Sequence, residues 1–576
     1  MAYDCDLVIR GGTVVDGSGG EPFTADVAVS GGKIAAVGRV PQRGREELDA
    51  AGLLVTPGFV DIHTHYDGQA TWDQRLAPSS CNGVTTAVMG NCGVGFAPVQ
   101  RSHHDLLIEL MEGVEDIPGA ALHEGLSWEW ESFGDYLDAL DRRPHDIDLC
   151  AQLPHGALRV YVMGERGAEG EAATPEEIET MGRLAAGAMR DGALGFSSSR
   201  TVRHRTSRGA PTPTLTAAED ELTGIADAIG ATGRGVLQVI SDFRDLDGEF
   251  GIFRRMVERS GRPLSISLSQ ADAKPDMWRE LLERIEAASD AGLPMKGQVC
   301  GRPIGTLLGL QGSLNPFMAH PSYRAIARLP LEEKVRTMRD PAFRERLLAE
   351  EPATDNPMVR YITGSWQKLF QLGDPPDYEP PPERSVAARA QREGRRPEEL
   401  AYDLLLERDG RELLYFPLFN YTEFNLDNAR RMMLHRDTVL GLGDGGAHVG
   451  AICDASFPTY MLTHWGRDRN RGERLELSWI VRSQTRATAE AVGLLDRGLL
   501  ARGMKADINL VDFQRLRLHP PRMAYDLPTG GRRLLQEADG YVATVVGGEV
   551  TYRDGRSTGA LPGRVVRGGR PSPAAA

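Results

Sequence analysis

The chain has 576 residues, and 66 Lys and Arg against 81 Asp and Glu give it a formal net charge of −15. With 41% hydrophobic and 26% charged residues, the composition is that of an ordinary globular protein rather than a disordered one. The acidic balance argues against nucleic acid as a partner, and no stretch approaches the roughly 20 apolar residues of a membrane helix. Six cysteines do not make a disulfide scaffold, and the N-terminal residues carry acid where a signal peptide carries base, so we expect a cytoplasmic protein.

Short alternating apolar segments lie at both ends of the chain. Residues 7–37 read as short strands separated by Gly-Gly turns, and a similar pattern returns between residues 507 and 552. We therefore expect a small β-sandwich domain built from residues 1–56 together with residues 503–564.

Between these ends, short apolar runs alternate with helical stretches, which is typical of βαβ units and a parallel sheet. Eight runs are expected to be strands: 54–63, 83–91, 147–153, 193–198, 235–241, 263–269, 294–300 and 438–444. The clearest helix begins at Thr174-Pro175-Glu176-Glu177, a capping threonine followed by proline and early acids. Further helices are expected at about 216–231, 275–291 and 473–493. The fold class is therefore α/β, a (β/α)8 TIM barrel over residues 57–502, with its active site at the C-terminal ends of the strands.

The connection before the last of these strands is far longer than the others and contains a charged, proline-rich stretch at residues 374–382. We interpret residues 303–410 as an insertion in the barrel, partly helical, that covers the catalytic face as a lid.

Two polar clusters follow the first and the last predicted strand. His63 and His65 are two residues apart, so along a strand they share a face, and two neutral imidazoles on one side suit Zn²⁺ or a similar ion. Asp444 ends the last strand ahead of two glycines and His448. A carboxylate in that place can bind a metal and take a proton from metal-bound water.

A third signal is Cys92, in Gly90-Asn91-Cys92-Gly93 after the second strand. Its thiolate could bind or bridge a metal, although a lone cysteine is more often a buried small apolar residue.

With these motifs together, the chain resembles the amidohydrolase superfamily, and within it the N-acyl-D-amino acid deacylase (D-aminoacylase) group. The resemblance rests on residues 57–65, 83–93, 192–197, Asp444 and 503–509, and it covers nearly the whole chain. It implies one or two zinc ions bound by His63, His65, Cys92 and Asp444, with the cysteine in place of the carbamylated lysine of other amidohydrolases. No lysine lies between Lys33 and Lys274, which excludes a carbamate bridge from the fourth strand.

The chain departs from the resembled family at the fifth and sixth strands, where the family places one histidine each. Gln238 and Gln270, or Ser267 and Ser269, stand there instead. Because amides and hydroxyls are weak zinc ligands, we expect the metal site to be weakened, reduced or missing.

Other side chains are expected to face the substrate. His155 and His204 follow the third and fourth strands and could enter the site. Four arginines lie in residues 200–208, where guanidinium groups such as those of Arg200 and Arg203 could bind a substrate carboxylate. His448, Gln238 and Gln270 complete the set of candidate substrate-binding residues.

These motifs favour a metal-dependent hydrolase of linear amide bonds, in which Asp444 acts as general base and acid. The expected substrate is a small molecule that carries a carboxylate. One alternative is a cyclic amide or imide hydrolase of the hydantoinase or dihydroorotase kind. Others are a scaffold that kept the barrel and lost the metal, and a non-hydrolytic or metal-free enzyme. The sequence leaves the oligomeric state open, and a homo-oligomer is compatible with it.

Overall fold

The protein is described by a computed structural model over residues 4–573. Its centre is an eight-stranded parallel sheet in the order β16-β12-β11-β10-β9-β8-β7-β6. The strands are β6 (Phe59–Asp61), β7 (Val84–Met89), β8 (Asp148–Pro154), β9 (Gly195–Arg200), β10 (Val236–Ser241), β11 (Leu264–Ser267), β12 (Met295–Val299) and β16 (Thr438–Leu440). The two edges meet just beyond the strand ends, where a parallel bridge pairs Thr64 with Gly445 and the His65 N–H donates to the Gly445 carbonyl at 2.7 Å. The expected TIM barrel is therefore confirmed, and it closes beside the two histidines.

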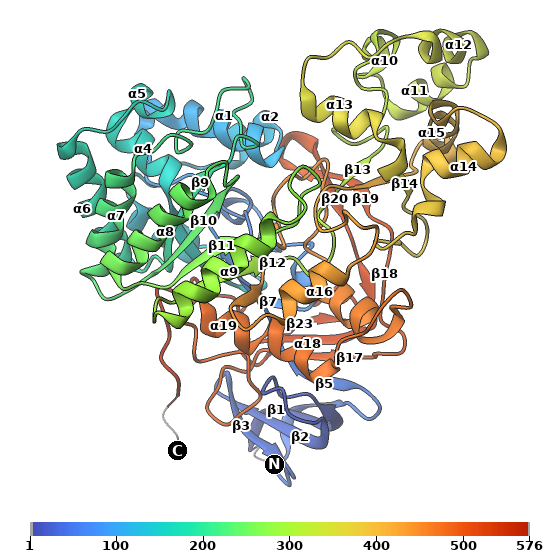
Figure 1. The fold of residues 1–576 in the computed structure, drawn as a ribbon. Coiled ribbons are helices and arrows are strands. Elements are labelled where there is room, and N and C mark those ends of the chain that lie inside the picture. The colour runs from blue at the N-terminus through green and yellow to red at the C-terminus, as the bar shows by residue number, and fades with distance from the viewer. Residues whose placement is uncertain (1–3, 574–576) are drawn as a thin grey trace.

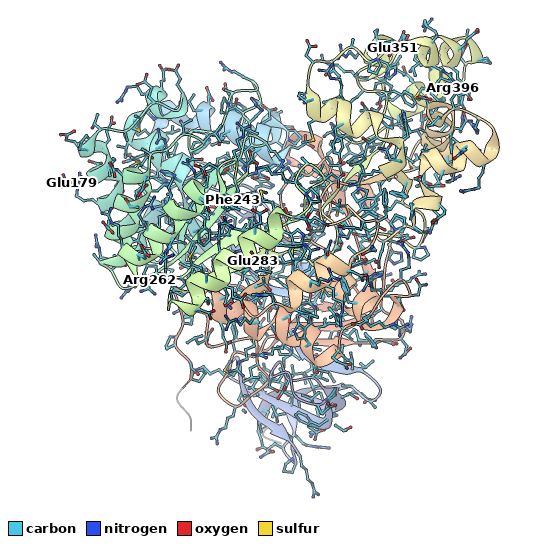
Figure 2. All side chains as sticks on the ribbon, in the orientation of Figure 1. Glu179, Phe243, Arg262, Glu283, Glu351 and Arg396 are labelled. Atoms are coloured by element: carbon cyan, nitrogen blue, oxygen red, sulfur yellow. The ribbon has the colours of Figure 1, made fainter. Side chains whose placement is uncertain are left out.

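Helices cover the outside of the barrel (Figure 1). The principal ones are α6 (Pro175–Asp191), α7 (Glu219–Gly230), α8 (Leu246–Ser260), α9 (Met277–Asp290), α18 (Leu477–Gln484) and α19 (Arg486–Ala491). Thr174 and Glu177 form the expected capping box at the start of α6. Exposed acids such as Glu179 and Glu283 face away from the barrel, whereas Phe243 is buried at 2% exposure (Figure 2). In the described part of the chain, no helix has the length and apolar character needed to cross a membrane.

Both ends of the chain build one extra sheet. The alternating segments at the two ends predicted such a shared β domain, although as a β-sandwich. Its order is β24-β23-β22-β17-β5-β1-β2-β3, with β4 paired to β1. The N-terminal strands are β1 (Cys5–Val14), β2 (Phe23–Ser30), β3 (Lys33–Gly38), β4 (Gly44–Asp49) and β5 (Leu54–Pro57), and the C-terminal ones are β17 (Ile508–Val511), β22 (Tyr541–Val546), β23 (Glu549–Arg553) and β24 (Arg556–Ser557). The antiparallel pair β5–β17 joins the two ends.

The apolar run 54–63 supplies two strands rather than one. Its first part, β5, belongs to the terminal sheet, and its second part, β6, begins the barrel. The break falls at Gly58, where an added Cβ would lie 2.2 Å from the Thr85 hydroxyl. A side chain at this position would collide with Thr85, so glycine lets the chain pass from one sheet to the other without displacing it.

The segment between β17 and β22 leaves the terminal sheet. It forms two small antiparallel pairs, β18 (Arg517–Leu518) with β21 (Ala538–Asp539) and β19 (Arg522–Leu527) with β20 (Gly531–Leu535). The second pair lies against the barrel, because the Leu534 N–H donates to the Val449 carbonyl at 2.7 Å.

The long connection between β12 and β16 forms a lobe of its own at one corner of the molecule (Figure 1). A three-stranded sheet, β13 (Gly305–Leu308), β15 (Leu414–Pro417) and β14 (Phe370–Gln371), carries a cover of helices. These are α10 (Pro321–Ile326), α11 (Leu331–Met338), α12 (Pro341–Ala349), α13 (Pro357–Gly364), α14 (Val386–Glu393) and α15 (Pro397–Leu405). The lobe has a separate hydrophobic cluster that includes Phe317, Met338 and Tyr402.

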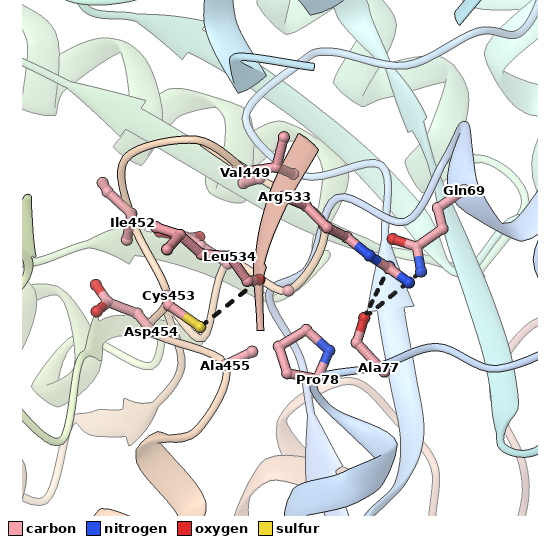
Figure 3. Close-up of a pocket in the computed structure, with 14 residues that line it drawn as sticks. Gln69, Ala77, Pro78, Val449, Ile452, Cys453, Asp454, Ala455, Arg533 and Leu534 are labelled. Atoms are coloured by element: carbon pink, nitrogen blue, oxygen red, sulfur yellow. Dashed lines mark hydrogen bonds between the residues drawn. The ribbon is translucent and has the colours of Figure 1, made fainter. Parts of the chain in front are cut away.

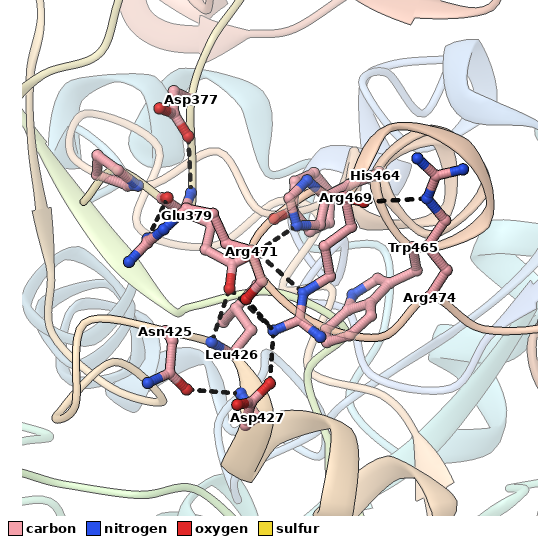
Figure 4. A network of polar contacts seen from close by, with 12 residues as sticks. Asp377, Glu379, Asn425, Leu426, Asp427, His464, Trp465, Arg469, Arg471 and Arg474 are labelled. Carbon is pink, nitrogen blue, oxygen red and sulfur yellow. Dashed lines mark hydrogen bonds and ion pairs between the residues drawn. The ribbon is translucent and has the colours of Figure 1, made fainter.

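A buried ionic network ties the base of this lobe to the barrel (Figure 4). Glu379 is 3% exposed and accepts hydrogen bonds from Arg469 at 3.0 and 3.1 Å. Its carboxylate also lies 2.7 Å from His464 Nε2 and accepts the Leu426 N–H at 2.9 Å. Burial acts to raise the pKa of Glu379, but His464 and Arg469 outweigh it and lower that pKa to about 2.

Candidate metal centre

Four potential metal ligands converge where the barrel closes. His63 and His65 follow β6, Cys92 follows β7, and Asp444 follows β16. His63 Nε2 lies 3.3 Å from Cys92 Sγ and 3.4 Å from Asp444 Oδ1, and His65 Nε2 lies 3.7 Å from the same oxygen. Donor atoms of His63, His65 and Cys92 all fall within 4.8 Å of one another. The structure thus brings together all four residues that the sequence proposed as ligands.

The backbone at the site is strained. Cys92, Asp444 and His448 adopt left-handed conformations, with φ of 53°, 49° and 46°. Such values are costly for residues with a Cβ, and they concentrate at functional sites.

The electrostatics of the cluster favour a cation. Burial acts to lower the pKa of His63, but Cys92 and Asp444 outweigh it and raise that pKa to about 9. Burial acts to raise the pKa of Asp444, but the two imidazoles lower it to about 2, and they likewise hold the pKa of Cys92 below its usual value. Buried anionic groups therefore surround the two imidazoles, an arrangement that favours positive charge at the centre of the cluster.

The ligand spacing fits a metal ion. Metal–ligand bonds of about 2.0–2.3 Å at tetrahedral angles separate neighbouring donor atoms by about 3.3–3.6 Å. The distances from His63 Nε2 to Cys92 Sγ and to Asp444 Oδ1 lie within this range, and the second is longer than an ordinary hydrogen bond. Two imidazoles, a thiolate and a carboxylate form a donor set that suits Zn²⁺.

Each histidine has a buried partner on its other ring nitrogen. His63 Nδ1 lies 2.7 Å from Gln298 Oε1, and Gln298 Nε2 donates to Ser265 Oγ at 2.8 Å. His65 Nδ1 lies 3.1 Å from Glu115 Oε1, and Glu115 is 1% exposed. The Gln298 acceptor puts the proton of His63 on Nδ1 and leaves its Nε2 lone pair free for an ion, whereas the contact of His65 Nδ1 with Glu115 is an ion-pair contact rather than a hydrogen bond.

Sequence reasoning missed Gln298 and Glu115. Glu115 carried a signal, since it occupies a position on the apolar stripe of helix α1 (His104–Glu115) shared with Ile108 and Met111. No local pattern in the sequence marks Gln298, because its partner His63 lies 235 residues away in the sequence.

A cavity of about 470 Å³ opens above these ligands. Three candidate substrate-binding residues line it, namely Arg203, His204 and His448, and Ser267 and Ser269 form part of its wall. Met358, Val359 and Ile362 of helix α13 also line it, so the inserted lobe contributes one side of the cavity. Burial and the nearby charge of His448 lower the pKa of His204 to about 3, which keeps its ring neutral.

The remaining candidates lie away from the cavity. Arg200 is held by Glu249 at 2.6 and 2.9 Å, and Gln270 donates to Glu423 at 3.1 Å. His155 lies 2.8 Å from Glu221 Oε1, in a buried group that also contains Arg159. Gln238 lies beneath the ligands, where its Oε1 accepts the Cys92 N–H at 2.8 Å. Long-range partners that the sequence does not reveal explain each of these placements.

The loop that carries Asp444 and His448 is supported by contacts with strand β20 (Figure 3). Arg533 and Leu534 of β20 lie against residues 449–455, and Arg533 also bonds to the Ala77 carbonyl at 3.3 Å. Arg302 holds Asp454 at 2.6 Å beneath the same loop, with both side chains buried. The catalytic face therefore depends on a strand pair from the C-terminal part of the chain.

Comparison with known proteins decides the family. The chain matches the amidohydrolase family over residues 46–552. It belongs to the amidohydrolase family. It is 38% identical to the D-aminoacylase of Alcaligenes xylosoxydans xylosoxydans over 194 residues, which span 34% of this chain and 37% of that relative.

Two solved structures share the fold across nearly the whole chain. A D-aminoacylase described for its binuclear metal centre superimposes with a TM-score of 0.65 at 23% identity, covering 99% of this chain and 100% of that one. An N-acyl-D-glutamate deacylase from Bordetella bronchiseptica, in complex with zinc and a phosphonate inhibitor, gives 0.62 at 22% identity, covering 98% and 99%.

Proposed function

We propose that the protein is a metal-dependent hydrolase that cleaves the amide bond of N-acyl-D-amino acids. The observation that carries the proposal is the convergence of His63, His65, Cys92 and Asp444 at the floor of a cavity that opens at the C-terminal ends of the barrel strands. The family membership and the named deacylase relatives agree with it.

His63, His65 and Cys92 would hold a zinc ion, with Asp444 at its side. When bound there, the ion would lower the pKa of a water molecule and polarise the scissile carbonyl. The family resemblance gives Cys92 the role that a carbamylated lysine has in other amidohydrolases, and no lysine lies between Lys33 and Lys274. The replacement of the expected strand-five and strand-six histidines favours a single ion over a pair.

Asp444 is the proposed general base and acid. Its low pKa keeps the carboxylate ionised at neutral pH, so it can accept a proton from the attacking water and pass it to the leaving nitrogen. The Asp444 side chain is 14% exposed and lines the cavity, whereas the neighbouring imidazoles of His63 and His65 are buried.

Arg203 is the proposed ligand of the substrate carboxylate. Its guanidinium lies over the Phe419 ring at 4.9 Å and bonds to Asp242 at 3.2 Å, which leaves further N–H groups available. His204 and His448 offer ring nitrogens on the same wall.

The cysteines bear on the location of the protein. All six are free thiols, which fits a reducing compartment, and we propose the cytoplasm.

Hydrolysis of N-acetyl-D- and N-acetyl-L-amino acids by the zinc-loaded enzyme tests the proposal. We expect turnover of a D-isomer and a loss of kcat of about 10²–10⁴-fold in Asp444→Asn, which keeps the size of the side chain but cannot take the proton. Absence of turnover on both series, or full activity in Asp444→Asn, would contradict the assignment.

A further inference from the structure

A second cavity, of about 350 Å³, lies inside the N-terminal half of the barrel, beneath the metal-site residues. Its walls come from the first residues of β10, β11 and β12, from β16 and from the end of α19. They are mainly apolar: Val236, Leu264, Met295, Val439 and Val492. Barrels of this fold are ordinarily filled by layers of large branched side chains. Here Ser265 takes one such place on β11, and it is half-buried although its strand lies in the middle of the sheet.

Three glutamines form the polar roof of this lower cavity: Gln152, Gln238 and Gln298. Gln152 is 2% exposed, and its Nε2 donates to Asn91 Oδ1 at 2.7 Å. The Asn91 amide nitrogen donates to two backbone carbonyls, which fixes the orientation of both side chains. Gln152 Oε1 is then left buried without a hydrogen-bond partner among residues 4–573. An acceptor in that state destabilises the fold unless a ligand or water donates to it.

The opposite end of the lower cavity is reached from the surface. Lys296 and Glu490 line it there, so the approach carries charges of both signs and selects for neither. A cavity of about 150 Å³ already accepts benzene, so the space is large enough for a six-carbon chain.

We propose that the lower cavity binds a neutral molecule with an aliphatic body and one hydroxyl or primary amide group, which donates to Gln152 Oε1. The apolar walls hold the body, and the roof amides that have an N–H to spare bind the oxygen of the same group. The proposal does not require the deacylase function, because no residue that lines this cavity is a proposed metal ligand, although the roof residues Gln298 and Gln238 contact His63 and Cys92.

Calorimetric titration of the full-length protein with 1-hexanol tests this site. We expect saturable binding of one molecule per chain, and binding at least about tenfold weaker in Val236→Phe, which fills the apolar wall. The matched control Ile178→Phe adds the same ring to a half-buried aliphatic position on α6 outside the cavity, and it should bind as the wild type does. Hexyl methyl ether, which cannot donate a hydrogen bond, should bind at least about fivefold more weakly than 1-hexanol.

A second measurement keeps the proposal testable if Val236→Phe does not fold. Crystals of the wild-type protein soaked with 6-bromo-1-hexanol should show an anomalous bromine peak among the apolar walls and the hydroxyl beside Gln152. Absence of saturable binding, equal affinity in Val236→Phe, or bromine located only in the upper cavity would overturn the proposal.

Discussion

The hydrogen bond between His63 and Gln298 allows the metal site to be tested without touching a proposed ligand. Gln298 is 2% exposed, and its Oε1 lies 2.7 Å from His63 Nδ1. In Gln298→Leu the size of the side chain is retained, but the N–H of a 1%-exposed imidazole loses its acceptor. A buried N–H donor without an acceptor costs about 1–3 kcal/mol of free energy, and 1.4 kcal/mol corresponds to a tenfold change in affinity. The Kd for zinc should therefore rise about 10- to 100-fold, as is typical when the outer partner of a metal-bound histidine is removed.

The assay is competition for zinc against a chelator of known affinity, with folding followed by circular dichroism. Gln270→Leu is the matched control, because Gln270 is equally buried but bonds to Glu423 away from the ligands. It should leave the zinc Kd unchanged, whereas Gln298→Glu, which keeps an acceptor, should restore most of the affinity. If Gln298→Leu folds and binds zinc as tightly as the wild type does, Gln298 does not orient His63 for a metal.

Two further predictions concern substrate binding and stability. Arg203→Ala should raise the KM for N-acyl-D-amino acids about 10- to 100-fold with a smaller effect on kcat, because it removes charged hydrogen bonds worth about 1.5–3 kcal/mol. Arg205→Ala changes an exposed arginine two residues away and should leave the KM unchanged. Equal increases in KM in the two variants would refute the role of Arg203. The pKa of Glu379 lies at about 2 in the folded protein against 4.5 unfolded, so its contribution is complete above pH 4.5 and is lost as the pH falls toward 2. The free energy of unfolding should thus drop by about 2 kcal/mol more between pH 6 and pH 3 in the wild type than in Glu379→Gln; parallel denaturation profiles for the two proteins would contradict this.

Local patterns in the sequence were enough to predict most of the fold. Alternation of apolar runs and helical segments located all eight barrel strands, and the capping box at Thr174 marked the start of α6. The division of residues 54–63 into β5 and β6 could not be read from the apolar pattern, because it depends on the close approach of Thr85 to Gly58.

The candidate site was predictable only where chemistry and local spacing coincide. His63 and His65 share a strand end, and Asp444 ends another, so their meeting follows from the barrel itself. In the sequence Arg200 and Arg203 are equivalent candidates. In the structure the Arg200 guanidinium donates to Glu249, 49 residues further along, and Arg203 is the one of the two that lines the cavity. Contacts between distant segments decide such cases, and no local pattern encodes them.

Zinc X-ray absorption of the reconstituted full-length protein tests the central claim most directly. With His63, His65 and Cys92 as ligands, the spectrum should contain one sulfur at about 2.3 Å and two imidazole nitrogens at about 2.0–2.1 Å, and the sulfur should disappear in Cys92→Ser. A zinc shell made only of nitrogen and oxygen in the wild type, or no zinc retained after gel filtration, would contradict the account.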